Sequence, residues 1–428
     1  HMVISRLKSS RVPLYGRPEP EQDPFPSGPV RLGWAPDDKA KPTGATAMIY
    51  KTYGRTDHKF SAIGFGGMRF DMSRSDEENA ELLLYAHDKG VNYFDTAPDY
   101  CQDRSEPIFG IALRQMARQR EQIYVSTKRM PDPHDNFAAV RADVQQSLDR
   151  LGLDYIDVYH VWCIRSLEQY ALAMRPGGLY ESLLRLKEDG AIRHLAISTH
   201  LPGTEIRRII DDGAFEGVLL GVNVLNFQFR WPGVQAAHEA GWGVVAMNPL
   251  AGGLIPQNHQ ALSFLAREGD DPTTAALRFC VGCPEITVTL VGFTKREHID
   301  TACRVAESAR PFTPDDLEAV RRHLSQNMDV LCTGCGYCDG LCPRNVPVPS
   351  YMQFYNDRLL MHKTDAQMVE HARFHHGWGL LHARPARAAD CTACGRCEQA
   401  CTQHLPIIRR LEEIAAWEAR ALGEPNHT

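Results

Sequence analysis

Eight of the 13 cysteines stand in two short runs of the same spacing. The stretches "CTGCGYCDGLCP", from Cys332, and "CTACGRCEQACT", from Cys391, both read C-x2-C-x2-C-x3-C. Such runs are typical of bacterial ferredoxins, in which three close thiolates and one thiolate from the other run hold each 4Fe-4S cluster. The spacing therefore predicts two 4Fe-4S clusters, whose chemistry is the transfer of single electrons.

The same pattern predicts which cysteines share a cluster. One set is Cys332, Cys335, Cys338 and Cys401, and the other is Cys391, Cys394, Cys397 and Cys342. The first run ends in Cys-Pro, as the pattern expects, whereas the second ends in Cys-Thr. Structural zinc sites and disulfides are the alternatives, but zinc usually takes two separated ligand pairs and disulfides belong to oxidising compartments.

A second group of ionisable residues lies at the ends of three successive predicted strands. Asp95 ends the run "VNYFD" and Tyr100 follows it, Lys128 ends "IYVSTK", and His160 ends "YIDVYH". A phenol with an ordinary pKa near 10 keeps its proton at neutral pH and can donate it to a developing alkoxide. We expect Lys128 to lower the pKa of Tyr100 and Asp95 to hold Lys128 in place. We expect His160 to orient the substrate oxygen.

Each member of this group also has an ordinary structural interpretation. An aspartate can cap a helix, a tyrosine or histidine can pack in a core, and a lysine is usually solvated. Four such residues at the ends of three successive strands are more consistent with an active site, because the carboxyl ends of parallel barrel strands share one mouth.

The elements that must position these residues alternate along the chain. Eight apolar, β-rich runs are each followed by a longer amphipathic stretch: "AIGFGG", "VNYFDT", "IYVSTK", "YIDVYH", "HLAIST", "GVLLGVNV", "GVVAMN" and "VTLVG". Helices are expected over 136–151 and over 179–189, with Gly190 as the C-cap of the second. Eight strand–helix repeats predict an α/β fold, a (β/α)8 TIM barrel over 48–312. A doubly wound open sheet is the alternative.

Regions of different texture flank the predicted barrel. Residues 1–47 are rich in proline and are predicted to be an extension without a fold of its own, its first His-Met pair a cloning remnant. Two short strands are predicted within 48–62, where they could plug the bottom of the barrel. Residues 313–428 are predicted to be a separate helical, ferredoxin-like domain with helices over 350–362 and 407–422.

Several stretches resemble a known enzyme family. The segments "NYFDTAPDY", "VSTKR", "RLGLDYIDVYHV" and "PLAGG" resemble the aldo-keto reductase superfamily, and they include the whole set Asp95, Tyr100, Lys128 and His160. The resemblance implies a barrel with a nicotinamide cofactor across its mouth, and a catalytic tetrad made of these four residues. With the two cysteine runs, the chain resembles iron–sulfur aldo-keto reductase-like oxidoreductases.

The resemblance also implies a set of residues for binding NAD(P)H, although this chain departs from the family at several of them. The matching positions are Ser198, Thr199, Asn223, Met247, Leu250, Gly292, Lys295 and Arg296. The family often has an aromatic residue where Met247 stands, and a Glu-Asn pair where Thr301 and Ala302 stand. Lys295 and Arg296 could bind a 2′-phosphate or could simply be solvated. NAD(P)H binding therefore stays open.

Other residues could border the pocket. Met68, Arg69 and Phe70 follow the first strand of the predicted barrel, and Trp162 follows the fourth, so these side chains are expected to shape the substrate site. Arg69 could contact an anionic group of a substrate. Five cysteines outside the runs are expected to be buried small hydrophobic residues, two of them at the edge of the pocket: Cys101, Cys163, Cys280, Cys283 and Cys303.

Together these features favour an oxidoreductase that acts on a small carbonyl or hydroxy-carbonyl compound, with the clusters relaying electrons from a ferredoxin- or flavodoxin-type carrier. A conventional NAD(P)H-dependent carbonyl reductase with structural or redox-sensing clusters is one alternative, and a non-catalytic redox-responsive subunit is another. A net charge of -6 with interspersed signs gives no basic face for nucleic acid or for a membrane. A cytoplasmic location is expected.

Overall fold

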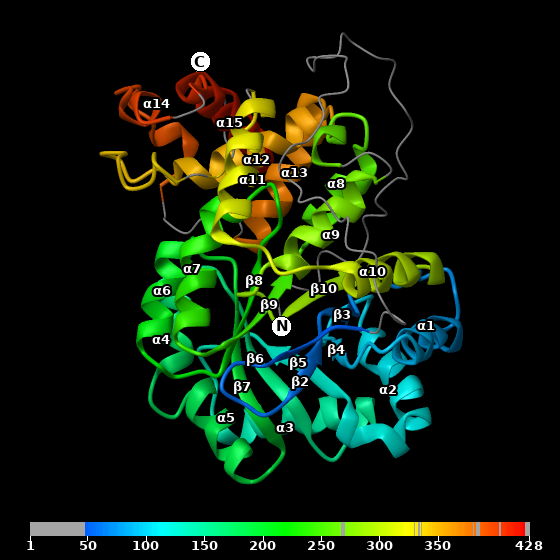
Figure 1. Ribbon diagram of the computed structural model, residues 1–428. Coiled ribbons are helices and arrows are strands. Elements are labelled where there is room, and N and C mark those ends of the chain that lie inside the picture. The colour runs from blue at the N-terminus through cyan, green and yellow to red at the C-terminus, as the bar shows by residue number, and fades with distance from the viewer. Residues whose placement is uncertain are drawn as a thin grey trace. The chain divides into compact units, whose positions relative to one another are not determined.

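Eight parallel strands close into a barrel, which Figure 1 shows surrounded by helices. The computed structural model describes residues 48–266, 270–328, 330–332, 334, 336–379, 381, 386–401 and 404–423. Around the barrel the strands follow the order β10-β3-β4-β5-β6-β7-β8-β9. Their bounds are β3 Ile63–Gly66, β4 Tyr93–Asp95, β5 Tyr124–Arg129, β6 Ile156–Ile164, β7 Ile192–Thr199, β8 Gly217–Gly221, β9 Gly243–Met247 and β10 Val288–Gly292. The predicted (β/α)8 barrel is confirmed, and each strand falls on one of the eight predicted runs.

Helices follow the strands and cover the outside of the barrel. They are α1 Asp76–Asp88, α2 Ser105–Gln115, α3 Phe137–Leu151, α4 Leu167–Met174, α5 Leu179–Glu188, α6 Gly203–Asp211, α7 Phe227–Glu239, α8 Leu254–Gln257, α9 Pro272–Gly282 and α10 Arg296–Ser308. The predicted helix over 136–151 is α3, which starts after Asn136 because this side chain accepts from the backbone N–H groups of Ala138 and Ala139. Gly190, with φ +81°, lies one residue beyond the cap residue Asp189 of α5.

Strand β6 runs past its predicted end. It reaches Ile164, so Trp162 lies within the strand and not after it. The pairing with β7 shifts between Val161 and Ile164, and Cys163 has φ +61°. An irregularity of this kind, a β-bulge, often stands next to an active site because it redirects neighbouring side chains.

An antiparallel hairpin packs against the barrel strands from the amino-terminal side. Its strands are β1 Tyr50–Thr52 and β2 Lys59–Ser61. The rings of Tyr53 and Phe60 are fully buried and pack against barrel residues that include Tyr93 and Val245. Lys51 Nζ donates to three backbone carbonyls after and within α9, at 2.7, 3.0 and 2.7 Å, which fastens the hairpin to the barrel. The predicted two-stranded plug is therefore present.

The chain after the barrel is helical around a core of its own. Its elements are α11 Pro314–Asn327, α12 Val348–Leu360, α13 Asp365–Trp378, α14 Arg396–Gln399 and α15 Ile407–Leu422. Helices α12 and α15 coincide with the two helices predicted here. Tyr351 of α12 and Trp417 of α15 are buried in this core together with Cys332, Cys338 and Cys397. Tyr351 donates its hydroxyl proton to Glu418 Oε1 at 2.7 Å, so a buried hydrogen bond joins α12 to α15.

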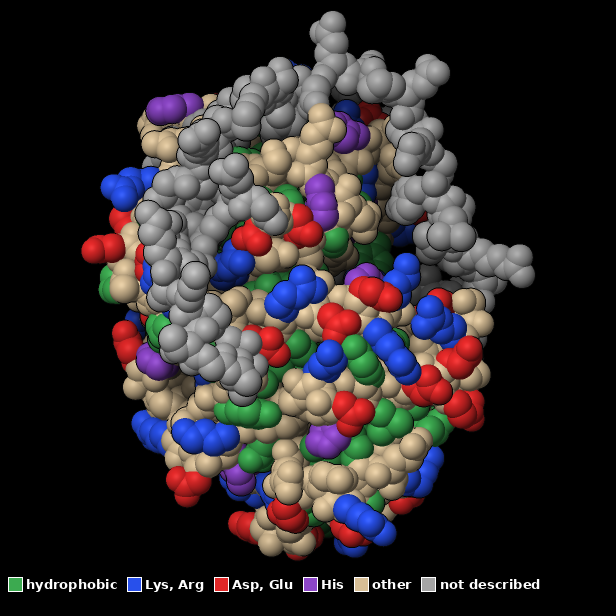
Figure 2. Space-filling model, turned by 45° about the vertical axis from the view of Figure 1, so that its right-hand side comes forward, with side chains coloured by type: hydrophobic (Ala, Val, Ile, Leu, Met, Phe, Trp, Pro, Cys, Tyr) green, Lys and Arg blue, Asp and Glu red, His purple; other side chains and the backbone are tan. Residues whose placement is uncertain are grey.

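Short 3-10 helices complete the described elements, namely η2 Ala117–Gln122, η3 Ala251–Gly253, η4 Ser263–Leu265 and η5 Ala388–Asp390. The proline-rich extension predicted over 1–47 lies outside the described residues. Within the part of the chain that is described, no helix is both long and apolar enough to cross a membrane. On the face shown in Figure 2, acidic and basic side chains are interspersed, as the sequence predicts.

Candidate active site

A buried ion pair forms the base of the candidate site. Lys128, near the end of β5, donates from Nζ to Asp95 Oδ2 at 2.6 Å and to the backbone carbonyl of Thr96 at 2.7 Å. The Ser126 hydroxyl donates to the other carboxylate oxygen of Asp95, at 2.6 Å. Both charged side chains are almost completely buried, with exposed fractions of 0% and 3%. Because each charge has its partners, the pair can stay ionised without water around it.

Tyr100 lies in the loop after β4, and its ring lies beside the Lys128–Asp95 ion pair. Lys128 Nζ is 5.1 Å from the centroid of the Tyr100 ring, and the Trp162 ring packs edge-on against that ring with centroids 5.6 Å apart. Four non-glycine residues next to Tyr100 have a positive φ, which is a strained conformation: Asp99, Cys101, Gln102 and Asp103. Such strain persists only where the surroundings fix the loop, and here Arg150 binds both carboxylate oxygens of Asp103 at 2.8 Å.

Burial controls the protonation of Tyr100. The pKa of its phenol is raised well above 10, first because the ring is buried and next because the Asp95 carboxylate lies nearby. The net shift is upward because burial is its largest cause, and the lowering expected from Lys128 stays a prediction. Burial also lowers the pKa of Lys128, although Asp95 opposes that shift. Tyr100 thus keeps its proton and can act as a donor throughout the neutral range.

His160 is the neighbour of Lys128 across the sheet, because the two residues pair in the register of β5 and β6. Its Nε2 lies 3.5 Å from the Tyr93 hydroxyl and 4.0 Å from Asp95 Oδ1. Its Nδ1 is buried and has no hydrogen-bond partner among the described residues. Burial, with Lys128 next, lowers the pKa of His160 well below 6.5, so the ring is neutral. A buried ring nitrogen without a partner is a natural contact for a bound molecule.

The eight residues assigned to NAD(P)H lie at or just after the carboxyl ends of the other barrel strands. Ser198 and Thr199 end β7, Asn223 follows β8, Met247 ends β9, Leu250 precedes η3, Gly292 ends β10, and Lys295 and Arg296 begin α10. The barrel therefore brings all of them to the same end as the tetrad. The positions of these eight residues in the barrel therefore agree with those that the resemblance implies.

Two polar residues of this second set, Thr199 and Asn223, are already engaged within the protein. The Thr199 hydroxyl donates to the Ile164 carbonyl at 3.0 Å and accepts from the Leu201 N–H at 3.1 Å. The Asn223 carboxamide accepts from the Leu225 N–H at 3.0 Å and donates to the Asn248 carbonyl at 3.1 Å. These side chains hold the loops after β7 and β8 in place. In this conformation they do not fit the role of free donors to a nicotinamide.

The residues expected around the adenosine half also contact protein groups. Arg296 forms an ion pair of 3.4 Å with Glu81 and lies over the Tyr85 ring at 5.0 Å. A Cβ atom at Gly292 would come within 2.7 Å of Cγ of Arg69, so the Arg69 side chain lies across the end of β10. Lys295 is exposed. The structural interpretation of Arg296 is therefore the better supported one.

The cysteine runs present thiols to backbone donors. The N–H groups of Gly334, Ala393 and Leu405 point at the sulfur atoms of Cys332, Cys391 and Cys401, at 3.4, 3.4 and 3.5 Å. Hydrogen bonds from backbone N–H groups to cysteine sulfur are among the features that tune iron–sulfur clusters. Cys335 lies outside the described residues. The 12 described cysteines are free thiols, so none of them forms a disulfide.

Cysteines of the two runs lie near each other or near a shared neighbour, while the crossed assignment of ligands stays a prediction. Cys342 of the first run lies within electrostatic range of Cys391 of the second. Cys332 and Cys401, from different runs, both lie within range of the Arg410 guanidinium. Among the other candidate ligands, Cys338 and Cys397 are buried and Cys394 is exposed. The donor set of thiolates therefore fits two 4Fe-4S clusters.

The residues predicted to border the pocket divide into two groups. Trp162 contacts Tyr100, and Arg69 lies near enough to the phenol to act on it electrostatically. Met68 is 56% exposed. Phe70, in contrast, is buried against Phe65 and Phe109, with ring centroids 5.8 and 5.9 Å apart, so it belongs to the core.

The five cysteines outside the runs are buried or half-buried. Cys163, Cys280, Cys283 and Cys303 are buried, as expected, and Cys101 is partly exposed. Cys101 donates from Sγ to the Gly67 carbonyl at 3.4 Å. Cys163 packs with Ala97 and Trp162 beside Tyr100.

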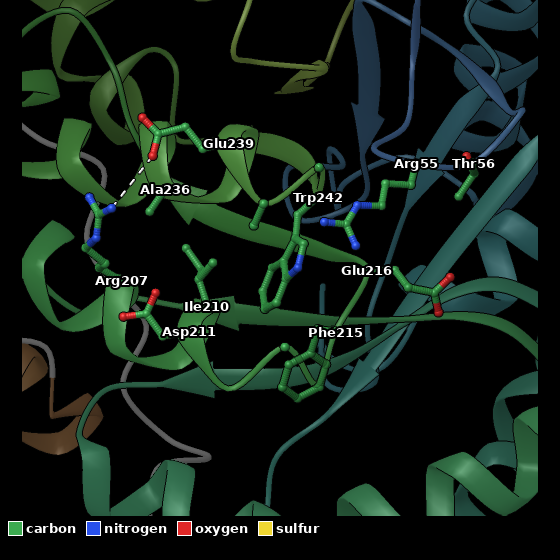
Figure 3. A pocket seen from close by; sticks show the side chains of 13 residues that line it. Arg55, Thr56, Arg207, Ile210, Asp211, Phe215, Glu216, Ala236, Glu239 and Trp242 are labelled. Carbon is green, nitrogen blue, oxygen red and sulfur yellow. Dashed lines mark ion pairs between the residues drawn. The ribbon is translucent and has the colours of Figure 1, made fainter.

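A pocket of about 530 Å³ lies at the other end of the strands. Glu216 and Trp242, which line it, immediately precede β8 and β9, and Arg55 comes from the turn of the hairpin (Figure 3). An ion pair of 3.7 Å joins Arg207 to Glu239 at one side of the pocket. In parallel barrels, residues at this amino-terminal end serve stability, so the pocket is separate from the candidate active site.

Some contributors to the site were missed from the sequence. Ser126, which fixes Asp95, stands two residues before Lys128 in "VSTK", so strand alternation places it on the same inward face. That signal could have identified it. The same alternation places Tyr93, two residues before Asp95, on this face, whereas the Thr96 carbonyl depends on tertiary contacts and carries no signal in the sequence.

The barrel and its mouth define a class of protein, an oxidoreductase built on a parallel (β/α)8 barrel. Comparison with known families assigns residues 62–325 to the Aldo/keto reductase family and residues 331–406 to a 4Fe-4S dicluster domain. The chain therefore belongs to the aldo/keto reductase family and carries a 4Fe-4S dicluster domain that follows the barrel in the sequence.

Relatives of known name match up to about two thirds of the chain. L-galactose dehydrogenase of Arabidopsis thaliana is 29% identical over 287 residues, which cover 60% of this chain and 87% of the relative. The uncharacterized oxidoreductase YqkF of Bacillus subtilis is 25% identical over 317 residues, covering 66% and 98%. Among solved structures, the aldo-keto reductase AKR11C1 of Bacillus halodurans in its holo form matches with a TM-score of 0.56 and 22% identity, covering 64% of this chain and 96% of that one. This last likeness supports the fold alone.

Proposed function

We propose that this protein is an iron–sulfur oxidoreductase that interconverts a small carbonyl compound and the corresponding alcohol at Tyr100, with two 4Fe-4S clusters relaying the electrons. The observation that carries the proposal is the buried Lys128–Asp95 pair beside a protonated Tyr100. A scaffold protein would have no need to bury such a pair next to a phenol. The family membership and the L-galactose dehydrogenase relative favour a hydroxy-carbonyl substrate such as a small sugar.

The described residues account for the proton that reaches the substrate oxygen. Reduction of a carbonyl to an alcohol consumes two electrons and two protons. One proton goes to the substrate oxygen: the O–H bond of Tyr100 breaks as a new O–H bond forms there, and the resulting phenolate is stabilised by the Lys128 ammonium and regains its proton from solvent. The second proton would come from solvent water and form the C–H bond at the former carbonyl carbon, and both electrons would come one at a time from the external carrier through the clusters. Asp95 keeps that ammonium charged and in place. In the tautomer that carries its proton on Nδ1, His160 can donate to the same substrate oxygen and orient it.

The cysteines supply the means of moving electrons. Cys332, Cys335, Cys338 and Cys401 would hold one cluster, and Cys391, Cys394, Cys397 and Cys342 would hold the other. When bound, such clusters supply one-electron transfer. We therefore propose a one-electron protein carrier of ferredoxin or flavodoxin type as the partner, and a reducing compartment such as the cytoplasm, where thiolates remain available. The proposed domain limits are 48–312 for the barrel and 313–428 for the cluster domain.

A conventional NAD(P)H-dependent carbonyl reductase is the second candidate. The complete tetrad and the family membership favour it. Against it stands the engagement of Thr199, Asn223 and Arg296, three of the assigned cofactor residues, with protein groups.

The two candidates differ in their reductant, so a turnover assay separates them. Cluster-loaded protein would be supplied anaerobically with small aldehydes, ketones and sugars, and with either NADPH or NADH or a chemically reduced one-electron carrier. We expect turnover with the carrier and a loss of that turnover in Tyr100→Phe. Turnover of the same compound with NAD(P)H alone, at a rate that the carrier cannot match, would contradict the proposal and support the second candidate.

A further inference from the structure

Three potential metal ligands meet between α12 and α13, in the segment that separates the two cysteine runs. Asp357 is in α12, and His371 and His375 are four residues apart in α13. Residues four apart on a helix lie on the same face, one turn from each other. Each of the three side chains has one potential ligand atom within 4.8 Å of those of the other two. They form the one such group among the described residues.

The contacts within this group are close and partly incomplete. His371 Nε2 and Asp357 Oδ2 are 2.8 Å apart, and the rings of His371 and His375 have centroids 4.4 Å apart. Nδ1 of His375 is buried and has no hydrogen-bond partner in the described part of the chain. Phe354 packs against both imidazoles, at 5.1 and 5.3 Å, which limits their rotation. The three side chains are therefore held close together, and Nδ1 of His375 remains without a hydrogen-bond partner among the described residues.

We propose that Asp357, His371 and His375 bind a divalent first-row transition-metal ion, zinc above the others. Two imidazole nitrogens and one carboxylate oxygen form a borderline donor set that suits zinc, with water as a fourth ligand. Zinc–ligand bonds of about 2.0–2.2 Å place tetrahedral ligand atoms roughly 3.4 Å apart, so separations within 4.8 Å need only small side-chain movements. Iron clusters take thiolate ligands, so this site would not compete with the cysteines.

A simpler interpretation is a hydrogen bond between Asp357 and His371 that joins two helices. That interpretation needs two of the three residues and leaves the buried Nδ1 of His375 unexplained. Lys363, in the turn between α12 and α13, lies within electrostatic range of Asp357 and acts against a metal cation. A bound ion must overcome this repulsion. Removal of the Lys363 charge should therefore strengthen metal binding, whereas removal of a histidine ligand should weaken it.

The position of the site suggests a structural purpose. Asn356, the neighbour of Asp357, exchanges two hydrogen bonds of 2.8 Å with the backbone N–H and carbonyl of Cys332. An ion bound by Asp357 would join α12 to α13 directly beside this contact. It would therefore stiffen the support of the first cysteine run, and it would do so whether or not the proposed activity is correct.

The test uses the cluster-loaded full chain, kept anaerobic, with Zn²⁺ alone as the probe. Bound zinc would be measured after removal of excess metal, the affinity by calorimetry, and the ligands by X-ray absorption at the zinc edge. We expect one zinc per chain with nitrogen and oxygen ligands, and an affinity at least about 100-fold weaker in His375→Ala and His371→Ala. Lys363→Met should bind zinc more tightly than the wild type. His376→Gln is the matched control, because His376 is the next residue of α13 but contacts Glu418 at 2.8 Å, and it should bind zinc as the wild type does.

Iron content and circular dichroism would show whether each variant is folded and loaded with clusters. If the histidine variants do not fold, the increase of affinity in Lys363→Met still decides the matter. Sulfur ligands at the zinc edge, or equal zinc binding by wild type, His375→Ala and Lys363→Met, would overturn the proposal.

Discussion

The two halves of the barrel mouth use their polar side chains differently. Around β4 to β6, Lys128 and Asp95 satisfy each other while Tyr100 keeps its proton and His160 keeps a free ring nitrogen. Around β7 to β10, the hydroxyl of Thr199 and the carboxamide of Asn223 are bound to backbone groups of their own loops and of neighbouring segments. In the first half, a phenol and a ring nitrogen remain able to hydrogen-bond a bound molecule. In the second half, the polar side chains of Thr199 and Asn223 stabilise the protein's own backbone.

This difference explains how a chain can keep the proton chemistry of its family and depart from it elsewhere. In the proposed mechanism, proton donation depends on the four residues Asp95, Tyr100, Lys128 and His160, and burial together with one ion pair shifts the pKa values of Tyr100 and Lys128. Electron supply can come from another source once the chain carries a cluster domain. The account therefore predicts large effects in the first half of the mouth and small effects in the second.

The largest effect is expected from removal of the proton donor. Tyr100→Phe should lower the turnover of any carbonyl substrate by about 10²- to 10⁴-fold, because a positioned acid contributes that much, and it should leave the fold intact. Steady-state rates under anaerobic conditions measure this change. Tyr124→Phe, which alters another tyrosine of the barrel, is the matched control and should retain most of the activity. Equal rates for the two variants would show that Tyr100 is not the proton donor and would contradict the difference drawn between the two halves of the mouth.

Loss of the buried lysine should reduce both stability and activity. Lys128→Met leaves the Asp95 carboxylate buried without its partner, which typically costs about 3–5 kcal/mol of unfolding free energy. Denaturant unfolding followed by circular dichroism would measure the loss. Lys59→Met, at an exposed position on the hairpin, should change the unfolding free energy by less than about 0.5 kcal/mol. A stability loss below about 1 kcal/mol for Lys128→Met would show that the pair is not the base of the site.

In the second half of the mouth, a pH effect on stability is expected from His200, which follows β7. Its pKa is lowered to about 3 by burial and by Arg230 and Arg165. The unfolded histidine titrates near 6.5, so between these values the unfolded chain binds a proton that the folded chain does not. The unfolding free energy should therefore fall as the pH falls from 6.5 to 5, by up to about 1.4 kcal/mol per pH unit from this residue.

His200→Gln cannot take up that proton, so its stability should depend less on pH over the same interval. Unfolding curves of the two proteins at pH 6.5, 5.8 and 5 measure the difference between their slopes. Parallel slopes would show that His200 is accessible to water and would weaken the description of this half as closed.

The smallest effect is expected at Arg296, on the rim of the same half. Its ion pair with Glu81 is more than half exposed on both sides, and such pairs contribute about 0.2–1 kcal/mol at most. Arg296→Ala should change NADPH affinity, measured by fluorescence titration, by less than about threefold. A loss of tenfold or more would show that Arg296 binds a 2′-phosphate and would favour the NAD(P)H-dependent alternative.

The sequence predicted most of the fold because the periodic patterns are local. Eight apolar runs gave the eight strands, the spacing of apolar residues gave α3, and the helix predicted over 407–422 is α15. The bulge at Cys163 was not predictable, since its positive φ depends on how β6 meets β7. As a result, the end of β6 was placed too early and Trp162 was placed outside the strand.

The site was predictable where strand ends determine it and not where loops do. Asp95 ends β4, Lys128 lies near the end of β5, and His160 lies within β6 but pairs with Lys128 in the register, so the barrel brings the three together once the strands are known. Whether Thr199 and Asn223 offer free donors depends on the loops that follow, and those loops bind them. The upward pKa shift of Tyr100 was also missed, because its largest cause is burial of the ring, which depends on the tertiary structure.

The most direct test of the account asks whether electrons in the clusters reach a substrate at Tyr100. A carbonyl compound that the protein turns over with any reductant would be added to protein whose clusters have been reduced and freed of excess reductant, with no NAD(P)H present. The account predicts that this compound reoxidises the clusters, seen as loss of the reduced-cluster EPR signal, and that reoxidation is at least about 100-fold slower in Tyr100→Phe. Clusters that stay reduced with a compound that the same preparation converts with NADPH would contradict it.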